Sequence, residues 1–121
     1  MANILVIEDT PANMKLTCLL LESAGHAVSR APDAETGLTL ARAGHPDLIL
    51  MDIQLPGMDG LAATALLKRD PATAGIPVLA LTAMAMKEDQ EKARAAGCDG
   101  YIAKPIRYQE LYAAIDALLR P

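Results

Sequence analysis

Residues 47–60 read DLILMDIQLPGMDG, and this stretch decides the fold. Within it, four consecutive apolar residues, Leu48 to Met51, lead directly into Asp52. A short run that is apolar on both alternating faces is typical of a parallel strand covered by helices on both sides. The stretch therefore predicts a buried central strand that ends in a carboxylate.

Similar short runs recur on both sides of this strand. They are Ile4 to Ile7, Ala27 to Ala31, Val78 to Leu81 and Tyr101 to Ala103. The second run, around Val28, is weaker in apolar character, as expected of an edge strand. Longer segments with a helical pattern separate the runs, so the order of elements predicts a (βα)₅ unit that closes as a three-layer α/β sandwich.

Helix boundaries can also be predicted from the sequence. Thr10 is a candidate N-cap, with Pro11 at the first helical position. Asp33 and Glu35 place acids in the first turn of the next helix. We expect left-handed C-cap residues at three glycines that follow periodic stretches, namely Gly25, Gly44 and Gly97. The last segment, Tyr108 to Leu119, has an apolar stripe formed by Leu111, Ile115, Leu118 and Leu119.

Length and composition limit the classes of function. The chain has 121 residues, which suits one domain over residues 1–121 and leaves no room for an effector domain. A net charge of −4 argues against a broad electrostatic contact with nucleic acid. Cys18 and Cys98 form no disulfide framework, and no signal peptide or membrane span is apparent. We therefore expect a cytoplasmic protein that binds neither nucleic acid nor membrane.

Chemically active side chains follow four of the five predicted strands. Glu8 and Asp9 follow the first strand, Asp52 the third, Thr82 the fourth and Lys104 the fifth. In an open α/β sheet the site forms beyond the carboxyl ends of the strands. Clustered carboxylates repel one another unless a hard cation such as Mg²⁺ binds between them. Carboxylates, a metal ion, a hydroxyl and a lysine together indicate phosphoryl transfer.

Each of these residues also has an ordinary structural interpretation. An aspartate at a strand end is often a turn residue or helix cap, and Lys104 could be a surface lysine with an apolar stem. Their joint occurrence at successive strand ends favours a functional site over these separate roles.

The chain resembles the receiver domain of bacterial two-component response regulators. The resemblance extends from Ile4 to Leu119 and rests on VIEDT at 6–10, DLILMDIQLPGMDG at 47–60, IPVLALTAMAM at 76–86 and YIAKPI at 101–106. It implies a doubly wound, parallel five-stranded sheet of the flavodoxin-like or CheY-like type, with strand order 2-1-3-4-5. Among single-domain members, the phrases NMKL at 13–16 and LILMDIQLP at 48–56 are most similar to those of a cell-division regulator.

The resemblance also implies a role for each site residue. Asp52 would be the phosphoacceptor, with Thr82 and Lys104 bound to phosphoryl oxygens. Asp9, Asp52 and the backbone carbonyl of Gln54 would bind Mg²⁺ directly, and Glu8 would act through water. Such a domain would catalyse only its own phosphotransfer and a slow autodephosphorylation.

Further expectations from the resemblance concern switching and the backbone. Tyr101 would be an aromatic switch that turns inward when Thr82 is drawn to the phosphate. The Lys104–Pro105 peptide bond would be cis. The residues two positions beyond Asp52 and Thr82, which tune dephosphorylation in this family, are Gln54 and Met84 here.

The expected partners are a sensor or hybrid histidine kinase, a histidine phosphotransfer protein, or both, and the chain is expected to be a monomer or a weak dimer. The first helix, with Met14, Leu16 and Cys18 to Leu21, is apolar beyond one core stripe and could receive the phosphoryl donor. We expect Leu19 and Leu20 to be buried. The output surface would be the face reached from Thr82 through Met84, Met86, Tyr101 and Ala103.

Three other functions remain open at this stage. A phosphatase of the haloacid-dehalogenase type also combines Asp, Thr and Lys, but it would need a second aspartate at position 54, which is Gln. A flavin carrier would need aromatic walls around the flavin, and the chain has no Trp and no Phe. A receiver used only for docking would not need the complete acidic set.

Overall fold

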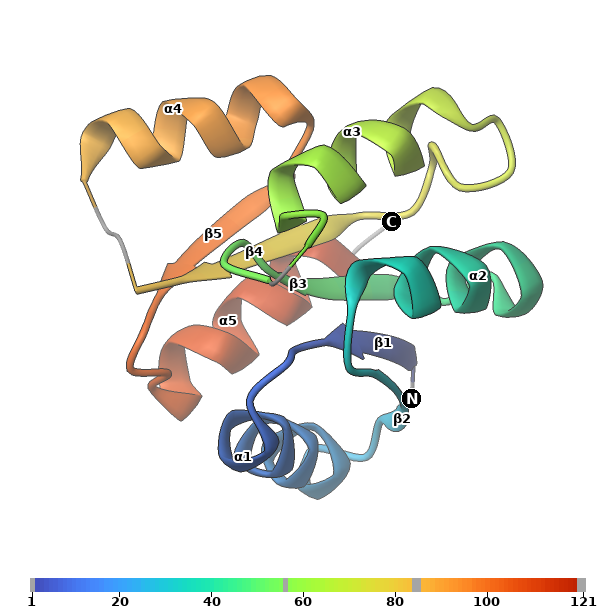
Figure 1. Ribbon diagram of the computed structural model, residues 1–121. Helices are drawn as coiled ribbons and strands as arrows, with labels where there is room; N and C mark the ends of the chain where they lie inside the picture. Colours follow the sequence, from blue (N-terminus) through green and yellow to red (C-terminus); the bar gives the residue numbers. More distant parts are fainter. Residues whose placement is uncertain (1, 56, 84–85, 120–121) are drawn as a thin grey trace.

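A computed structural model describes residues 2–55, 57–83 and 86–119, and Figure 1 shows their arrangement. Strands and helices alternate throughout. The strands are β1 (Asn3–Ile7), β2 (Ala27–Ala31), β3 (Leu48–Asp52), β4 (Val78–Thr82) and β5 (Gly100–Ala103). The helices are α1 (Pro11–Ser23), α2 (Ala34–Gly44), α3 (Gly60–Arg69), α4 (Lys87–Ala96) and α5 (Tyr108–Leu119).

All neighbouring strands pair in parallel, in the order β2-β1-β3-β4-β5. The predicted fold class and strand order are confirmed. Every residue of β3 and β4 is buried, whereas β2 at one edge of the sheet is mostly exposed. The continuous apolar run of residues 48–51 therefore reflects a strand covered on both faces, as the sequence indicated.

Two apolar clusters lie on opposite faces of the sheet, and Figure 1 shows α2 and α3 on one face and α1 and α5 on the other. The cluster under α2 and α3 includes Leu5, Ile49 and Leu67. The cluster under α1 and α5 includes the next residues along the same strands, such as Val6 and Leu50. Alternate strand residues thus supply alternate layers of the core.

The ends of the helices agree only in part with the sequence expectations. Thr10 is the N-cap of α1 without a side-chain capping bond, and Pro11 is its first residue. Gly97 is the left-handed C-cap of α4, with φ 108°, as predicted. The prediction for Gly44 was wrong, because Gly44 is the last residue of α2 and His45 adopts the left-handed conformation, with φ 45°. Glycine favours such a position but is not required there.

The exposed face of α1 corrects a second expectation. Leu19 is 53% exposed and Leu16 is 46% exposed, so the prediction that Leu19 is buried was wrong. Leu20 is half-buried against the α1–α5 cluster. Within residues 2–55, 57–83 and 86–119, no helix has the length and apolar character needed to cross a membrane. Met84, expected on the output surface, lies outside the described residues.

Candidate functional site

The carboxyl ends of β1, β3, β4 and β5 bring the predicted site residues to one edge of the sheet. Glu8 and Asp9 follow β1, Asp52 and Thr82 end β3 and β4, and Lys104 follows β5. Glu8, Asp52 and Thr82 are each at most 2% exposed, whereas Asp9 is exposed. Buried polar side chains at the end of an otherwise apolar sheet need partners, and Glu8 and Asp52 find them in each other and in Lys104.

Lys104 contacts both buried acids of the site, Asp52 and Glu8. Its Nζ donates to Asp52 Oδ2 at 3.2 Å and to Glu8 Oε2 at 3.3 Å. The Lys104 amide also donates to the Thr82 carbonyl at 2.7 Å, and the Lys104–Pro105 peptide bond is cis, as predicted. The lysine is therefore part of the site, and its interpretation as a surface residue is excluded.

The two buried carboxyls have different proton affinities. Burial, a hydrogen bond with Asp52 and the Asp52 charge raise the pKa of Glu8 to about 7, although Lys104 and a hydrogen bond from Asn13 act to lower it. Burial also acts to raise the pKa of Asp52, but hydrogen bonds with Glu8, Gln54 and Lys104 outweigh it, so the pKa of Asp52 is lowered. Without a metal ion, Asp52 is thus the ionised member of the pair and Glu8 the one that retains a proton near neutral pH.

Glu8, Asp9 and Asp52 together have the character of a cation site. One carboxylate oxygen from each lies within 4.8 Å of the others. Three hard oxygen donors at this spacing, two of them buried, fit a small divalent ion such as Mg²⁺. The acidic cluster predicted from the sequence is therefore brought together by the fold.

The loops that follow β3 and β4 are joined by Gln54. Its backbone N–H donates to Asp52 Oδ1 at 2.9 Å, and its side-chain Oε1 accepts the Ala83 N–H at 3.2 Å. This bridge places the loop after β4 beside Asp52. The sequence could not indicate this side-chain bridge, because the partner of the Gln54 side chain is 29 residues away in the chain.

Thr82 and Tyr101 are also in contact. Burial and the nearby Asp89 charge raise the pKa of the Tyr101 hydroxyl, and its hydrogen bond with the Thr82 side chain acts in the opposite direction. The expected switch pair is therefore adjacent, with Tyr101 half-buried.

Two residues near the site were not singled out from the sequence. Asn13 in the first turn of α1 forms a hydrogen bond with Glu8. Gly60 begins α3 where a Cβ would collide with the Asp52 carbonyl oxygen and would lie 2.7 Å from the Ile53 Cα. A residue with a side chain would therefore push α3 away from the end of β3. The glycine in the motif at 47–60 was a signal that could have indicated this close approach.

Comparison with known proteins places the chain in one family. Residues 4–116 match the response regulator receiver domain. The chain is 45% identical over 117 residues to the polar-differentiation response regulator DivK of Brucella ovis, covering 97% of this chain and 95% of that protein.

Solved structures agree with the sequence relatives. A putative response regulator from Chloroflexus aurantiacus aligns with a TM-score of 0.94 at 30% identity, covering 98% of this chain and 97% of that one. The receiver domain of a sensor histidine kinase from Pseudomonas aeruginosa, whose active-site cleft holds a magnesium ion, aligns with a TM-score of 0.91 at 33% identity, covering 98% and 97% of the two chains.

These similarities cover nearly the whole chain and favour a receiver over a haloacid-dehalogenase-type phosphatase. Receiver domains in general interact with histidine kinases and phosphotransfer proteins in two-component phosphorelays. The chain belongs to the response regulator receiver domain family and is a signalling protein of a two-component system.

Proposed function

We propose that Asp52 accepts a phosphoryl group from a phosphohistidine of a partner protein. A carboxylate oxygen of Asp52 forms the new O–P bond while the N–P bond of the phosphohistidine breaks, and the imidazole keeps the electron pair. The observation that supports this most directly is the 3.2 Å contact between Lys104 Nζ and Asp52 Oδ2. Together with the hydrogen bonds from Glu8 and Gln54, it keeps the buried carboxylate ionised, and it places a positive charge beside the incoming phosphoryl group.

Lys104 and Thr82 would stabilise the phosphoryl oxygens. Lys104 would pair with one oxygen, and the Thr82 hydroxyl would donate to another from the adjacent strand end. The negative charge of the transition state is spread over the equatorial oxygens, so donors from two different strand ends act together.

We also propose Mg²⁺ as the cofactor. Asp9, Asp52 and the Gln54 backbone carbonyl would bind it directly, and Glu8 would act through water. The acidic cluster and the magnesium ion in the related Pseudomonas receiver support this assignment. When bound, Mg²⁺ supplies positive charge that offsets the repulsion between the acids and the phosphoryl group.

The phosphoryl donor would dock against the exposed face of α1 next to α5. Leu16, Leu19 and Tyr108 are large apolar side chains that are 46%, 53% and 54% exposed. Tyr112 on α5 donates to the Leu20 carbonyl on α1 at 2.8 Å, which keeps the two helices together. An exposed apolar helix face suits a helical partner, such as the domain of a histidine kinase or phosphotransfer protein that bears the phosphohistidine.

The phosphorylated domain would transmit its signal through contacts with other proteins rather than through binding to DNA. We propose that residues 1–121 form a receiver domain that acts in the cytoplasm as a monomer or weak dimer, with no enzymatic activity beyond its own phosphotransfer and slow autodephosphorylation. The match over residues 4–116 and the 95% coverage of DivK support this organisation. Thr82 and Tyr101 would couple phosphorylation to the surface formed by α4, β5 and α5.

The test is phosphotransfer profiling against a panel of phosphorylated histidine kinases and phosphotransfer proteins. We expect Mg²⁺-dependent transfer from a subset of donors to wild type and none to Asp52→Asn. Transfer that is undiminished in this variant would contradict the assignment of Asp52.

A further inference from the structure

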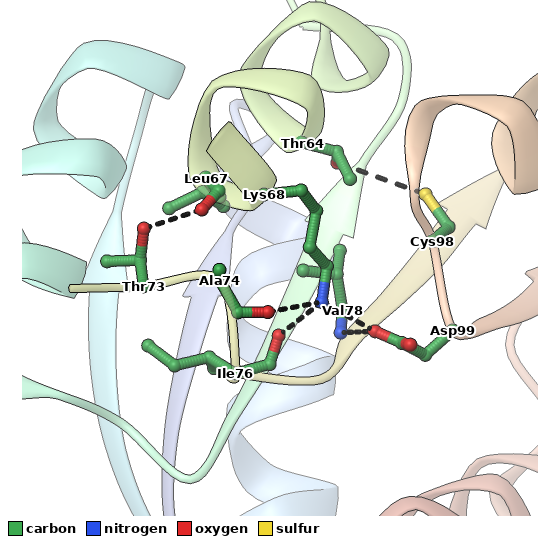
Figure 2. Close-up of polar contacts among 9 residues, drawn as sticks. All are labelled: Thr64, Leu67, Lys68, Thr73, Ala74, Ile76, Val78, Cys98 and Asp99. Carbon is green, nitrogen blue, oxygen red and sulfur yellow. Dashed lines mark hydrogen bonds and ion pairs between the residues drawn. The ribbon is translucent and has the colours of Figure 1, made fainter. Parts of the chain in front are cut away.

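A group of polar contacts lies at the end of the sheet opposite Asp52, and Figure 2 shows it. Lys68, in the last turn of α3, extends its ammonium group between two loops. Lys68 Nζ donates to the Ile76 carbonyl at 2.8 Å, to the Ala74 carbonyl at 3.4 Å and to Asp99 Oδ2 at 2.9 Å. We call Lys68, Asp99 and these backbone partners the Lys68 clamp.

Asp99 extends the clamp to the beginning of β4. Its Oδ2 accepts the Val78 N–H at 2.9 Å, and its own N–H donates to the Val78 carbonyl at 2.8 Å. The β4–β5 ladder continues directly from this point, with Leu79 opposite Gly100 and Thr82 opposite Ala103. The contacts of Asp99 therefore define where β5 begins along β4.

The Lys68 stem also packs against the segment that precedes Asp99. Gly97 has a φ of 108°, and a Cβ at this position would lie 2.7 Å from Lys68 Cγ. Cys98 Sγ, in turn, faces Thr64 Oγ1 on α3 at 3.9 Å. Residues 97–99, which connect α4 to β5, are thus held against α3 by consecutive contacts.

The α4 helix itself has little other attachment to the core. Ala93 is its only buried residue, and all ten residues of the helix are described. A hollow of about 160 Å³ lies beside it, bordered by Gln90, Arg94, Asp99 and Tyr101 among others. The helix is therefore held firmly where it joins residues 97–99, while its other end follows the loop after Thr82.

We propose that Lys68 is a positioning residue that fixes the pivot about which α4 moves when the receiver is phosphorylated. The inference rests on the proposed function, in which Thr82 is drawn towards the phosphoryl group. Because the clamp holds the α4–β5 connection to the beginning of β4, a displacement at Thr82 rotates α4 about residues 97–99 instead of shifting the whole segment. The rotation is transmitted to Tyr101, two residues beyond Asp99 and beside the hollow.

The experiment compares amide NMR shifts produced by Mg²⁺ and beryllofluoride, which imitates the phosphoryl group, in wild type and Lys68→Met. The variant keeps an unbranched apolar stem but loses the ammonium group. The control is Arg42→Met, which removes the 3.0 Å ion pair between Arg42 on α2 and Asp70. Asp70 is the C-cap of α3, the helix that carries Lys68, and this ion pair does not involve β4 or β5. Asp99→Asn is a second variant, because it keeps an acceptor for the Val78 N–H.

In wild type and in Arg42→Met, we expect residues 86–92 and Tyr101 to shift while residues 97–99 change little. In Lys68→Met and Asp99→Asn, residues 97–99 should shift as well, and the change at Tyr101 should fall by about half or more. The rate of phosphorylation by acetyl phosphate should stay within about twofold, because the clamp is a strand length away from Asp52.

The two possible failures are distinguishable. If wild type shows no change at Tyr101, the proposed output and the pivot both fail. If wild type responds and both clamp variants respond identically to it, even with lowered thermal stability, Lys68 is only a structural residue and the receiver function stands.

Discussion

Lys104 Nζ and Asp52 Oδ2 lie 3.2 Å apart, although 52 positions separate the two residues in the chain. The contact joins the end of β3 to the residue after β5, across the intervening end of β4. It places a cation beside a carboxylate that is 2% exposed, where screening by water is weak. The fold therefore provides an ionised carboxylate with a charge partner, which suits the proposed role of Asp52 as the nucleophile.

The first prediction concerns the phosphoacceptor. Wild type incubated with acetyl phosphate and Mg²⁺ should gain one phosphoryl group, and Asp52→Asn should gain none, because an amide oxygen is a poor nucleophile. Intact-protein mass spectrometry measures the gain. Asp59→Asn is the control, because this nearby residue caps α3 by accepting from the Ala62 N–H and asparagine preserves that cap. A phosphoryl group on any other residue would contradict the prediction.

The second prediction concerns the metal ion. Millimolar Mg²⁺ should raise the free energy of unfolding by about 1 kcal/mol, and chelation should stop phosphorylation. Asp9→Asn should weaken this response and also stabilise the metal-free protein, since the Asp9 carboxylate no longer repels the ionised Asp52. Thermal unfolding with and without Mg²⁺ measures both effects, and Asp116→Asn on the exposed side of α5 serves as the control. A melting temperature that Mg²⁺ does not change, with phosphorylation intact in chelator, would argue against the metal site.

The third prediction concerns pH in the absence of metal. The pKa of Glu8 is raised from 4.5 to about 7 in the folded protein, so the folded state binds the proton more tightly than the unfolded state. Its contribution to stability is fully present below pH 4.5 and is lost as the pH rises towards 7, by roughly 1 to 3 kcal/mol. Asp52 has a lowered pKa and acts oppositely, since its contribution is lost only as the pH falls below its usual value of 3.8.

Denaturant unfolding in chelator at pH 5 and pH 7.5 tests this expectation. Glu8→Gln should remove most of the loss of stability between the two values, because glutamine does not titrate and can still donate a hydrogen bond to Asp52. If Glu8→Gln loses as much unfolding free energy between pH 5 and pH 7.5 as wild type does, Glu8 is ionised in the folded protein throughout this range.

The fourth prediction concerns the docking face. Leu19→Glu should reduce phosphotransfer from a protein donor about tenfold or more, because a charge would replace an apolar contact on α1. Phosphorylation by acetyl phosphate should not change, since that small donor needs no docking surface. Leu66→Glu is the matched control, with a leucine that is 36% exposed on α3. Equal losses for the two variants with the protein donor would show that the face of α1 has no special role.

Local sequence patterns were enough to predict most of the fold. The apolar runs that became β1, β3 and β4 are buried as expected, and Gly97 ends α4 in the left-handed conformation. Less accurate were the predictions of which residue ends a helix in the left-handed conformation and of which apolar residues of a helix face the core. His45 rather than Gly44 adopts the left-handed conformation after α2. Leu19 faces solvent, although the apolar composition of α1 suggested that it would lie in the core.

By itself, the sequence determined which residue types follow the strands. It also determined that they share one edge of the sheet, because parallel strands that alternate with helices all end at the same edge. Only the tertiary structure decided the partners of these residues. Lys104 contacts Asp52, Gln54 bridges to Ala83, and Lys68 binds Asp99, over separations of 52, 29 and 31 positions. Hydrogen bonds depend on distances of a few tenths of an ångström, which follow from strand register and helix packing and not from spacing along the chain.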